Sequence, residues 1–151
     1  KLAAAGVSLI PFEPGLSEDV RTVYNRSRSL SLGGRLIPAE DFARIADEID
    51  PRISYIAVAD DDKIVVGFLL ARIEQRETPE SWIELLAIER GWRSQGIADA
   101  LMSRHLADCV EVGVPLTGTT IDSKLNDESK SWLERWDFYP RSSDIIYAIE
   151  M

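Results

Sequence analysis

The sequence has few of the residues that build disulfides, zinc sites or membrane anchors. It contains one cysteine, Cys109, and one histidine, His105, among 151 residues. A single cysteine excludes an internal disulfide and fits a reducing compartment, and these two residues are too few ligands for a zinc site. No apolar run approaches the roughly 20 residues of a transmembrane helix, and no signal peptide is visible. We therefore expect a cytoplasmic protein with no metal and no membrane partner.

Positive charge is also scarce, because 17 Lys and Arg residues stand against 26 Asp and Glu residues and the formal net charge is -9. This balance argues against non-specific nucleic-acid binding, which needs a basic surface. It fits a cationic amine substrate, and equally a solvated acidic surface that serves only solubility. A hydrophobic content of 45% in 151 residues predicts one globular domain. We place this domain at residues 7–151, set Lys1–Gly6 aside as a remnant of protein expression, and expect a monomer or a homodimer.

Helical and strand-like patterns succeed one another along the domain, without an internal repeat. Helical spacing predicts four helices, at Ser17 to about Ser29, Ala39 to Ile49, Asp99 to about Val112, and Asn126 to Trp136. Apolar runs predict six strands, at Ser8–Phe12, Tyr55–Ala59, Ile64–Ile73, Ser81–Ile88, Leu116–Ile121 and Ile145–Ile149. Residues 30–38 form a loop in this scheme. A hairpin followed by a strand–helix–strand crossover predicts a mixed α/β sheet.

The turn that joins Ser81–Ile88 to the helix beginning at Asp99 is the most informative stretch. Its sequence is Arg93-Ser94-Gln95-Gly96-Ile97-Ala98. A glycine turn that enters a helix directs free backbone N–H groups toward one point at the positive end of the helix dipole. The stretch is therefore typical of a phosphate-binding loop.

Two common phosphate loops do not match this turn. Gly91 and Gly96 have the spacing of a nucleotide-binding P-loop, but Ile97 and Ala98 stand where its Lys-Ser/Thr pair is required. The dinucleotide fingerprint G-x-G-x-x-G is absent as well. A magnesium-dependent nucleotide enzyme is therefore disfavoured.

The turn resembles the acyl-CoA pyrophosphate loop of the GNAT N-acetyltransferases, whose pattern is Arg/Gln-x-x-Gly-x-Gly/Ala. Arg93, Gly96 and Ala98 fit all three specified positions. A second family motif is matched in part, by Asn126, Ser129, Trp132, Glu134, Arg135 and Phe138. The resemblance covers nearly the whole domain. It implies a GNAT fold, with a mixed central sheet of six to seven strands flanked by about four helices and splayed between the fourth and fifth strands.

Two residues depart from the second motif. Leu133 stands where many relatives have the tyrosine that protonates the departing CoA thiolate, and a leucine donates no proton. Either Tyr139 or water serves instead, or the fold no longer catalyses transfer. Asp137 stands where glycine is usual, and an acid there adopts a left-handed turn at some energetic cost.

The resemblance implies acetyl-CoA as co-substrate and no metal. It implies a cofactor-binding set of Leu86, Ala87, Ile88, Arg93, Ser94, Gln95, Gly96, Ile97, Ala98, Asn126 and Trp132. The main chain of residues 86–88 would pair with the pantetheine arm, and the N–H groups of residues 95–98 would bind the pyrophosphate. Asn126 would contact the arm or hold the strands apart, or it caps the last helix. Trp132 lines the CoA channel or packs in the core.

The catalytic assignments are Glu84, Ile88 and Tyr139. The strand N–H near Ile88 would stabilise the oxyanion, and Glu84 would act as the base, directly or through water. The alternative for Glu84 is an edge-facing ion pair. His105 is interpreted as a locally satisfied helix histidine and Cys109 as a packing residue, rather than as catalytic groups.

Asp99 is an awkward neighbour of the phosphate loop, because its charge competes with phosphate for the same helix dipole. The alternative is a first-turn acid that stabilises the helix and points away from the ligand. The function predicted from these residues is transfer of an acetyl group from acetyl-CoA to a primary amine, on a small molecule or a protein, by direct attack in a ternary complex. The alternative is a non-catalytic acyl-CoA-binding or regulatory module.

Overall fold

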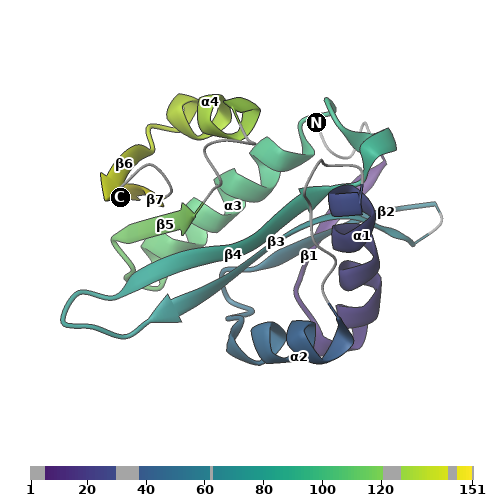
Figure 1. The fold of residues 1–151 in the computed structure, drawn as a ribbon, viewed down its shortest axis with the longest axis horizontal. Coiled ribbons are helices and arrows are strands. Elements are labelled where there is room, and N and C mark those ends of the chain that lie inside the picture. The colour runs from purple at the N-terminus through teal and green to yellow at the C-terminus, as the bar shows by residue number, and fades with distance from the viewer. Residues whose placement is uncertain (1–5, 30–37, 62, 121–126, 143–145, 151) are drawn as a thin grey trace.

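A computed structural model describes residues 6–29, 38–61, 63–120, 127–142 and 146–150 (Figure 1). Its α-helices are α1 (Ser17–Ser29), α2 (Ala39–Glu48), α3 (Ile97–Glu111) and α4 (Asp127–Arg135), with short 3-10 helices η1 (Pro14–Leu16) and η2 (Arg90–Trp92). Its strands are β1 (Val7–Pro11), β2 (Tyr55–Ala59), β3 (Val65–Glu74), β4 (Glu80–Ile88), β5 (Leu116–Thr120), β6 (Tyr139–Ser142) and β7 (Ile146–Glu150). None of the helices within these ranges is long and apolar enough to cross a bilayer.

The strands form one seven-stranded sheet in the order β1-β2-β3-β4-β5-β7-β6. Adjacent strands are antiparallel except β4 and β5, which are parallel and connected through α3. The expected mixed sheet with about four helices is therefore confirmed. The sequence pattern predicts six of these strands and misses β6, a four-residue edge strand that contains Pro140. Proline is tolerated there because an edge strand need not donate every N–H group to a ladder.

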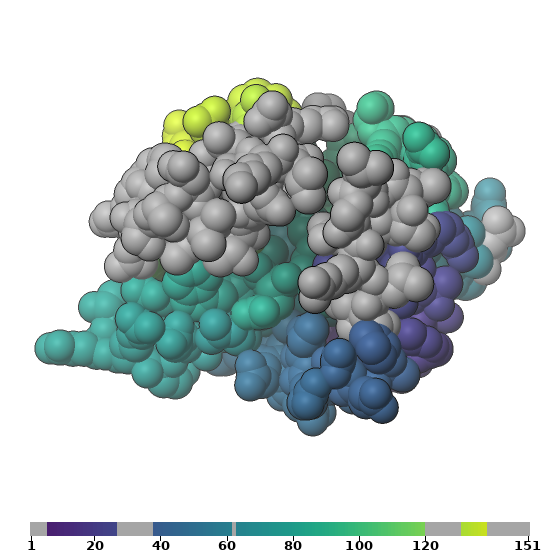
Figure 2. All heavy atoms as spheres, viewed as in Figure 1, coloured from purple at the N-terminus to yellow at the C-terminus, as the bar shows by residue number. Residues whose placement is uncertain are grey.

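The helices cover the two faces of the sheet. Helices α1 and α2 lie on one face, and α3 and α4 lie on the other (Figure 1). The core under α1 and α2 consists of Phe12, Val20, Val23, Phe42, Ile49, Ile56, Val65, Phe68, Leu70 and Leu85. The opposite core includes Ile83 of β4, Ile97 and Leu101 of α3, and Leu133 of α4. The hairpin that joins β3 to β4 projects from the body of the molecule (Figure 2).

Helices α3 and α4 end in the same backbone motif. At the end of α3, the Val114 N–H donates to the Cys109 carbonyl over 2.8 Å, and Gly113 between them has φ 81°. At the end of α4, the Phe138 N–H donates to the Leu133 carbonyl over 3.0 Å, and Asp137 has φ 67°. Both are Schellman ends, which require a left-handed residue and favour glycine. The left-handed turn expected at Asp137 is confirmed.

A buried polar network joins α3 to the parallel pair of strands. His105 Nδ1 lies 2.8 Å from the Ile53 carbonyl oxygen, and Nε2 lies 2.9 Å from Thr117 Oγ1. Because a carbonyl oxygen can only accept, Nδ1 carries the proton and Nε2 accepts from the Thr117 hydroxyl. The Ser81 hydroxyl donates to Thr117 Oγ1, and the Cys109 thiol lies 3.5 Å from Ser81 Oγ. The chain of donors therefore runs in one direction and ends at Ile53.

Burial sets the charge of both titratable groups in this network. It lowers the pKa of His105, which is inaccessible to solvent, and it raises the pKa of the Cys109 thiol to about 11. Both side chains are therefore neutral near pH 7. The interpretation of His105 as a locally satisfied histidine and of Cys109 as a packing residue is confirmed.

The two Schellman ends allow a matched test of backbone strain. We expect Asp137→Gly to raise the free energy of unfolding by about 0.5–1 kcal/mol, because glycine adopts the left-handed conformation without a Cβ penalty. Gly113→Asp should lower it by a similar amount, because a Cβ at Gly113 meets no atom within 4 Å and strain alone acts there. Urea denaturation measures both. Equal shifts of the same sign would contradict this account.

Neutral His105 makes stability depend on pH with a defined sign. Its folded pKa lies below the unfolded value of about 6.5, so the unfolded chain binds the extra proton as the pH falls through that value. We expect the free energy of unfolding to be highest above pH 6.5 and to fall below it by up to about 1.4 kcal/mol per pH unit. His105→Gln should lose this component, so that its urea midpoints between pH 5 and 8 form a flatter profile. Parallel profiles would contradict the neutral network.

Candidate functional site

The described ladder between the parallel strands β4 and β5 covers only the first part of β4. The two strands pair from Glu80 with Leu116 to Ile83 with Thr119, and the described part of β5 ends at Thr120 while β4 continues to Ile88. The described part of the ladder agrees with the expected splay between the fourth and fifth strands.

The open part of β4 presents main-chain groups toward β5. The Glu89 N–H donates to the Val66 carbonyl over 2.7 Å, so Glu89 faces β3. Because these groups alternate along a strand, the N–H and C=O groups of Ile88 and Leu86 point to the opposite edge. Those of Ala87 point to β3, so the predicted main-chain contact between Ala87 and a ligand is not favoured by this alternation. An extended ligand with amide groups could pair along this edge.

A β-bulge changes the direction of the side chains within β4. Leu70 pairs with Leu85 and Ala71 pairs with Ile83, which leaves Glu84 as the extra residue. After the bulge, Leu86 packs with the core under α3, although Glu84 lies on the face of α1 and α2 beside its partner Arg72. Simple alternation along β4 would place Glu84 and Leu86 on one side of the sheet, and the bulge separates them because it shifts the register between them.

Glu84 forms an ion pair. Arg72 Nε donates to Glu84 Oε1 over 2.6 Å, and the side chain of Glu84 is 33% exposed. Arg72 also lies 3.7 Å from Glu74, which in turn pairs with Arg76 at 3.0 Å. An ion pair was the alternative role that the sequence offered for Glu84. Its role as a catalytic base stays a prediction.

The phosphate loop has an open, left-handed backbone. Ser94 has φ 65° and Gly96 has φ 82°, and Gly96 is the N-cap of α3 with no side-chain hydrogen bond to the cap. A Cβ at Gly96 would meet no atom within 4 Å, and residues 93–96 are exposed. Left-handed residues at a helix N-terminus turn successive N–H groups toward one side, which is a geometry that binds anions.

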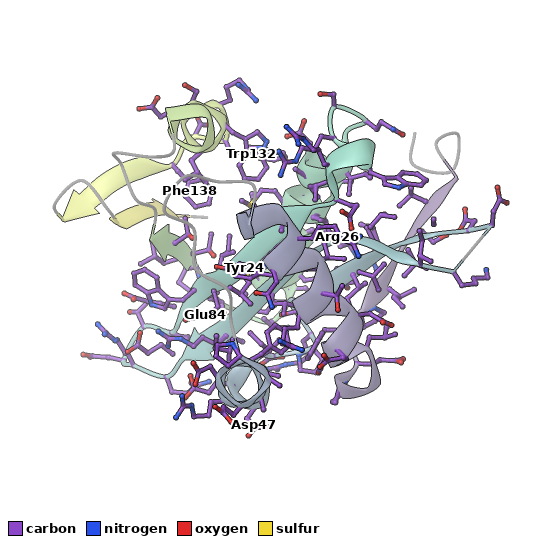
Figure 3. All side chains as sticks on the ribbon, turned by 45° about the vertical axis from the view of Figure 1, so that its right-hand side comes forward. Tyr24, Arg26, Asp47, Glu84, Trp132 and Phe138 are labelled. Carbon is purple, nitrogen blue, oxygen red and sulfur yellow. The ribbon has the colours of Figure 1, made fainter. Side chains whose placement is uncertain are left out.

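Two contacts hold this loop at the end of β4. Arg93 Nε donates to the Ile88 carbonyl over 3.3 Å, and Arg26 of α1 pairs with Glu89 at 2.7 Å. Figure 3 labels Arg26 on α1. The sequence alone does not indicate the Arg26 pair, because its members lie 63 positions apart.

Gly67 of β3 is a further residue that sequence reasoning misses. A Cβ there would lie 2.8 Å from Ile88 Cδ1 and 3.2 Å from the Ala87 carbonyl oxygen. Only glycine therefore permits β3 to approach the end of β4 this closely without a shift. A glycine inside a strand is the signal that could have found it.

Asp99 of α3 contacts α4. Its Oδ1 accepts the indole N–H of Trp132 over 2.7 Å and that of Trp136 over 3.0 Å. Figure 3 shows Trp132 pointing from α4 toward the start of α3. Asp99 is thus an acid in the first turn of α3, as one of the two alternatives states, and its carboxylate also bonds to α4. A contact between Trp132 and CoA stays a prediction.

The structure does not describe the side chain of Tyr139, the residue proposed to protonate the CoA thiolate. Leu133, which stands at the position of the usual tyrosine, is 3% exposed and packs in the core. Tyr139 lies in β6, but its side chain is outside the described part of the chain, as is Asn126. Their predicted roles are therefore unchanged.

The fold agrees with what comparison to known proteins finds. A family model described as the Acetyltransferase (GNAT) family matches residues 18–138. No curated protein sequence matches the chain.

Solved structures of the same fold are numerous. Ard1 from Thermoplasma volcanium is 21% identical with a TM-score of 0.74, and covers 95% of both chains. The NatC complex bound to Gag peptide and CoA contains a chain that is 13% identical with a TM-score of 0.81, covering 96% of this chain and 98% of that one. The ribosomal-protein-S18-alanine N-acetyltransferase from Escherichia coli is 14% identical with a TM-score of 0.75, covering 95% and 93%. At sequence identities this low, these similarities show a shared fold.

Proposed function

Because the chain belongs to the GNAT family of acetyltransferases, we propose that it transfers an acetyl group from acetyl-CoA to a primary amine by direct attack in a ternary complex. The observation that carries this proposal is the left-handed loop around Gly96, which follows the part of β4 that extends beyond the described ladder with β5. One anion site and one open strand edge therefore adjoin each other. A ligand with a pyrophosphate and an amide-containing arm has both complementary parts.

The residues present fit CoA. The N–H groups of residues 95–98 suit the pyrophosphate, and Gly96 lets it approach the backbone. Arg93 adds positive charge at the loop, and its bond to the Ile88 carbonyl fixes the end of β4. The main-chain groups of Leu86 and Ile88 suit the amides of the arm. Acetyl-CoA, when bound, would supply the acetyl group as a thioester.

We assign the remaining catalytic steps to residues of this chain. We assign the Ile88 N–H to the carbonyl oxygen, where a donor stabilises developing negative charge. Glu84 accepts the proton of the amine through water, and Arg72 holds its carboxylate in place. Tyr139 or water donates the proton to the departing thiolate, because Leu133 is apolar and buried.

The acceptor is proposed only as an amine. Among the similar structures, the NatC complex is bound to Gag peptide and CoA, and Naa50 from Arabidopsis thaliana is in complex with the bisubstrate analogue CoA-Ac-MVNAL. The net charge of -9 supports a cationic acceptor. A cytoplasmic protein that works as a monomer or homodimer remains part of the proposal. The buried Leu133 keeps a second candidate open, namely a module that binds acyl-CoA without turnover.

The loop is tested by titrating acetyl-CoA into the parent and into Gly96→Glu. We expect the variant to bind at least about 100-fold more weakly, because a carboxylate then occupies the anion site. The matched control is Gly113→Glu, which places the same side chain on a left-handed glycine at the other end of α3. Calorimetry measures affinity, and release of the CoA thiol with a panel of amines measures turnover. A parent that does not bind acetyl-CoA would contradict the proposal, and binding without turnover would favour the non-catalytic module.

The base is tested by Glu84→Gln. Loss of a general base should lower kcat by about 10²–10⁴-fold while the affinity for acetyl-CoA stays unchanged. Glu74→Gln is the control, because Glu74 contacts the same Arg72 without lying at the bulge. Equal activity of the two variants would assign Glu84 to the ion pair and not to catalysis.

A further inference from the structure

Asp99, Trp132 and Trp136 form one cluster, here called the indole clamp, between the start of α3 and α4. One oxygen, Asp99 Oδ1, accepts both indole N–H groups, over 2.7 Å and 3.0 Å. The two rings meet edge to face, with centroids 6.5 Å apart and an interplanar angle of 66°. The partners lie 33 and 37 positions from Asp99 in the chain. The clamp is therefore a tertiary contact and not a local feature of either helix.

Each member of the clamp depends on the others for its polar contacts. An indole N–H can only donate, and a half-buried indole needs an acceptor. Trp132 and Trp136 are both partly buried against the core under α3. A carboxylate bound by two N–H groups makes charge-assisted bonds, which are stronger than neutral ones. Asp99 thus serves as a bridge between two helices.

Both ends of the bridge are anchored. On α3, Ile97 is 1% exposed and directly follows Gly96 of the phosphate loop. On α4, Leu133 is 3% exposed and directly follows Trp132. Because both helices are fixed in one core, a bond between them sets the position of α4 relative to the loop. The bond sits on the third residue of α3, within the turn that holds the loop.

The charge of Asp99 works against a phosphate at the same helix end. A carboxylate in the first turn interacts favourably with the helix dipole, but it repels an anion bound there. The two indole N–H groups direct Oδ1 toward α4. A neutral acceptor of the same shape would keep the bridge without the repulsion. The bridge and the charge therefore have opposite effects on CoA binding and can be separated by substitution.

We propose that Asp99 is a positioning residue for the phosphate end of the acyl-CoA site, which holds α4 against the phosphate loop through Trp132 and Trp136. This inference rests on the proposed function. It concerns affinity for CoA and not the acetyl-transfer step, because Asp99 bonds to Trp132 and Trp136 of α4, whereas Glu84 pairs with Arg72.

The test compares two substitutions at Asp99. Asp99→Ala removes the acceptor, and we expect the Kd of CoA and the KM of acetyl-CoA to rise about tenfold with kcat within twofold of the parent. Asp99→Asn keeps the amide oxygen as acceptor and removes the charge, so CoA should bind as tightly as to the parent or more tightly. Glu111→Gln, which removes an exposed charge from the other end of α3, is the control.

A second measurement detects the clamp without CoA. Two of the four tryptophans belong to it, so Asp99→Ala should increase quenching of tryptophan fluorescence by acrylamide, and Asp99→Asn should not. In the Asp99→Ala background, Trp136→Phe should have no further effect on the Kd of CoA, because its N–H partner is already gone.

The outcomes separate this inference from the proposed function. A parent that binds no CoA overturns both. A parent that binds CoA, with Asp99→Ala within twofold of it in Kd and KM, overturns the positioning role alone. Asp99→Asn as weak as Asp99→Ala also overturns it, because the acceptor would then not matter. A loss of melting temperature in Asp99→Ala without a change in KM would assign the clamp to stability only.

Discussion

The point at which β4 leaves β5 is the constraint on which the site depends. Beyond Ile83 and Thr119 the main-chain groups of Leu86 and Ile88 point to the edge of β4 that the described part of the ladder does not cover. Buried backbone polar groups need partners, so such an edge must be satisfied by water, by side chains or by a ligand. Arg93 already takes the Ile88 carbonyl, and the phosphate loop begins where β4 ends. The loop and the edge therefore come from a single local event in the sheet.

The same pair of strands is held firmly at its other end. Ser81 and Thr117 are register partners in the closed half of the ladder, and the buried network of His105 joins both to α3. Parallel pairs are slightly less stable than antiparallel ones, so a polar bond at the closed end adds support where it is needed. Helix α3 thus begins at the open end of the pair and carries its histidine to the closed end. Helix α3 therefore contacts the pair of strands at both of its ends.

The sequence predicts features whose cause is local, and it misses those that depend on two segments. The strand, the turn around Gly96 and the helix after it follow from neighbouring residues, as does the left-handed Asp137. The bulge at Glu84 is a property of the register between β3 and β4, so simple alternation along β4 misplaces the side chain relative to Leu86. The bridge from Asp99 to α4 and the pair of Arg26 with Glu89 join residues far apart in the chain. No spacing rule within one element could indicate them.

The one-way chain of donors from Cys109 to Ile53 has a consequence for changing this protein. Each hydroxyl and thiol in it donates to one partner, Nδ1 of His105 carries the ring proton while Nε2 accepts, and the carbonyl at its end can only accept. A substitution at one position leaves a buried donor or acceptor without a hydrogen-bond partner. Anyone who redesigns the core should therefore treat Ser81, His105, Cys109 and Thr117 as a single unit, to be kept together or replaced together by apolar residues of matching volume.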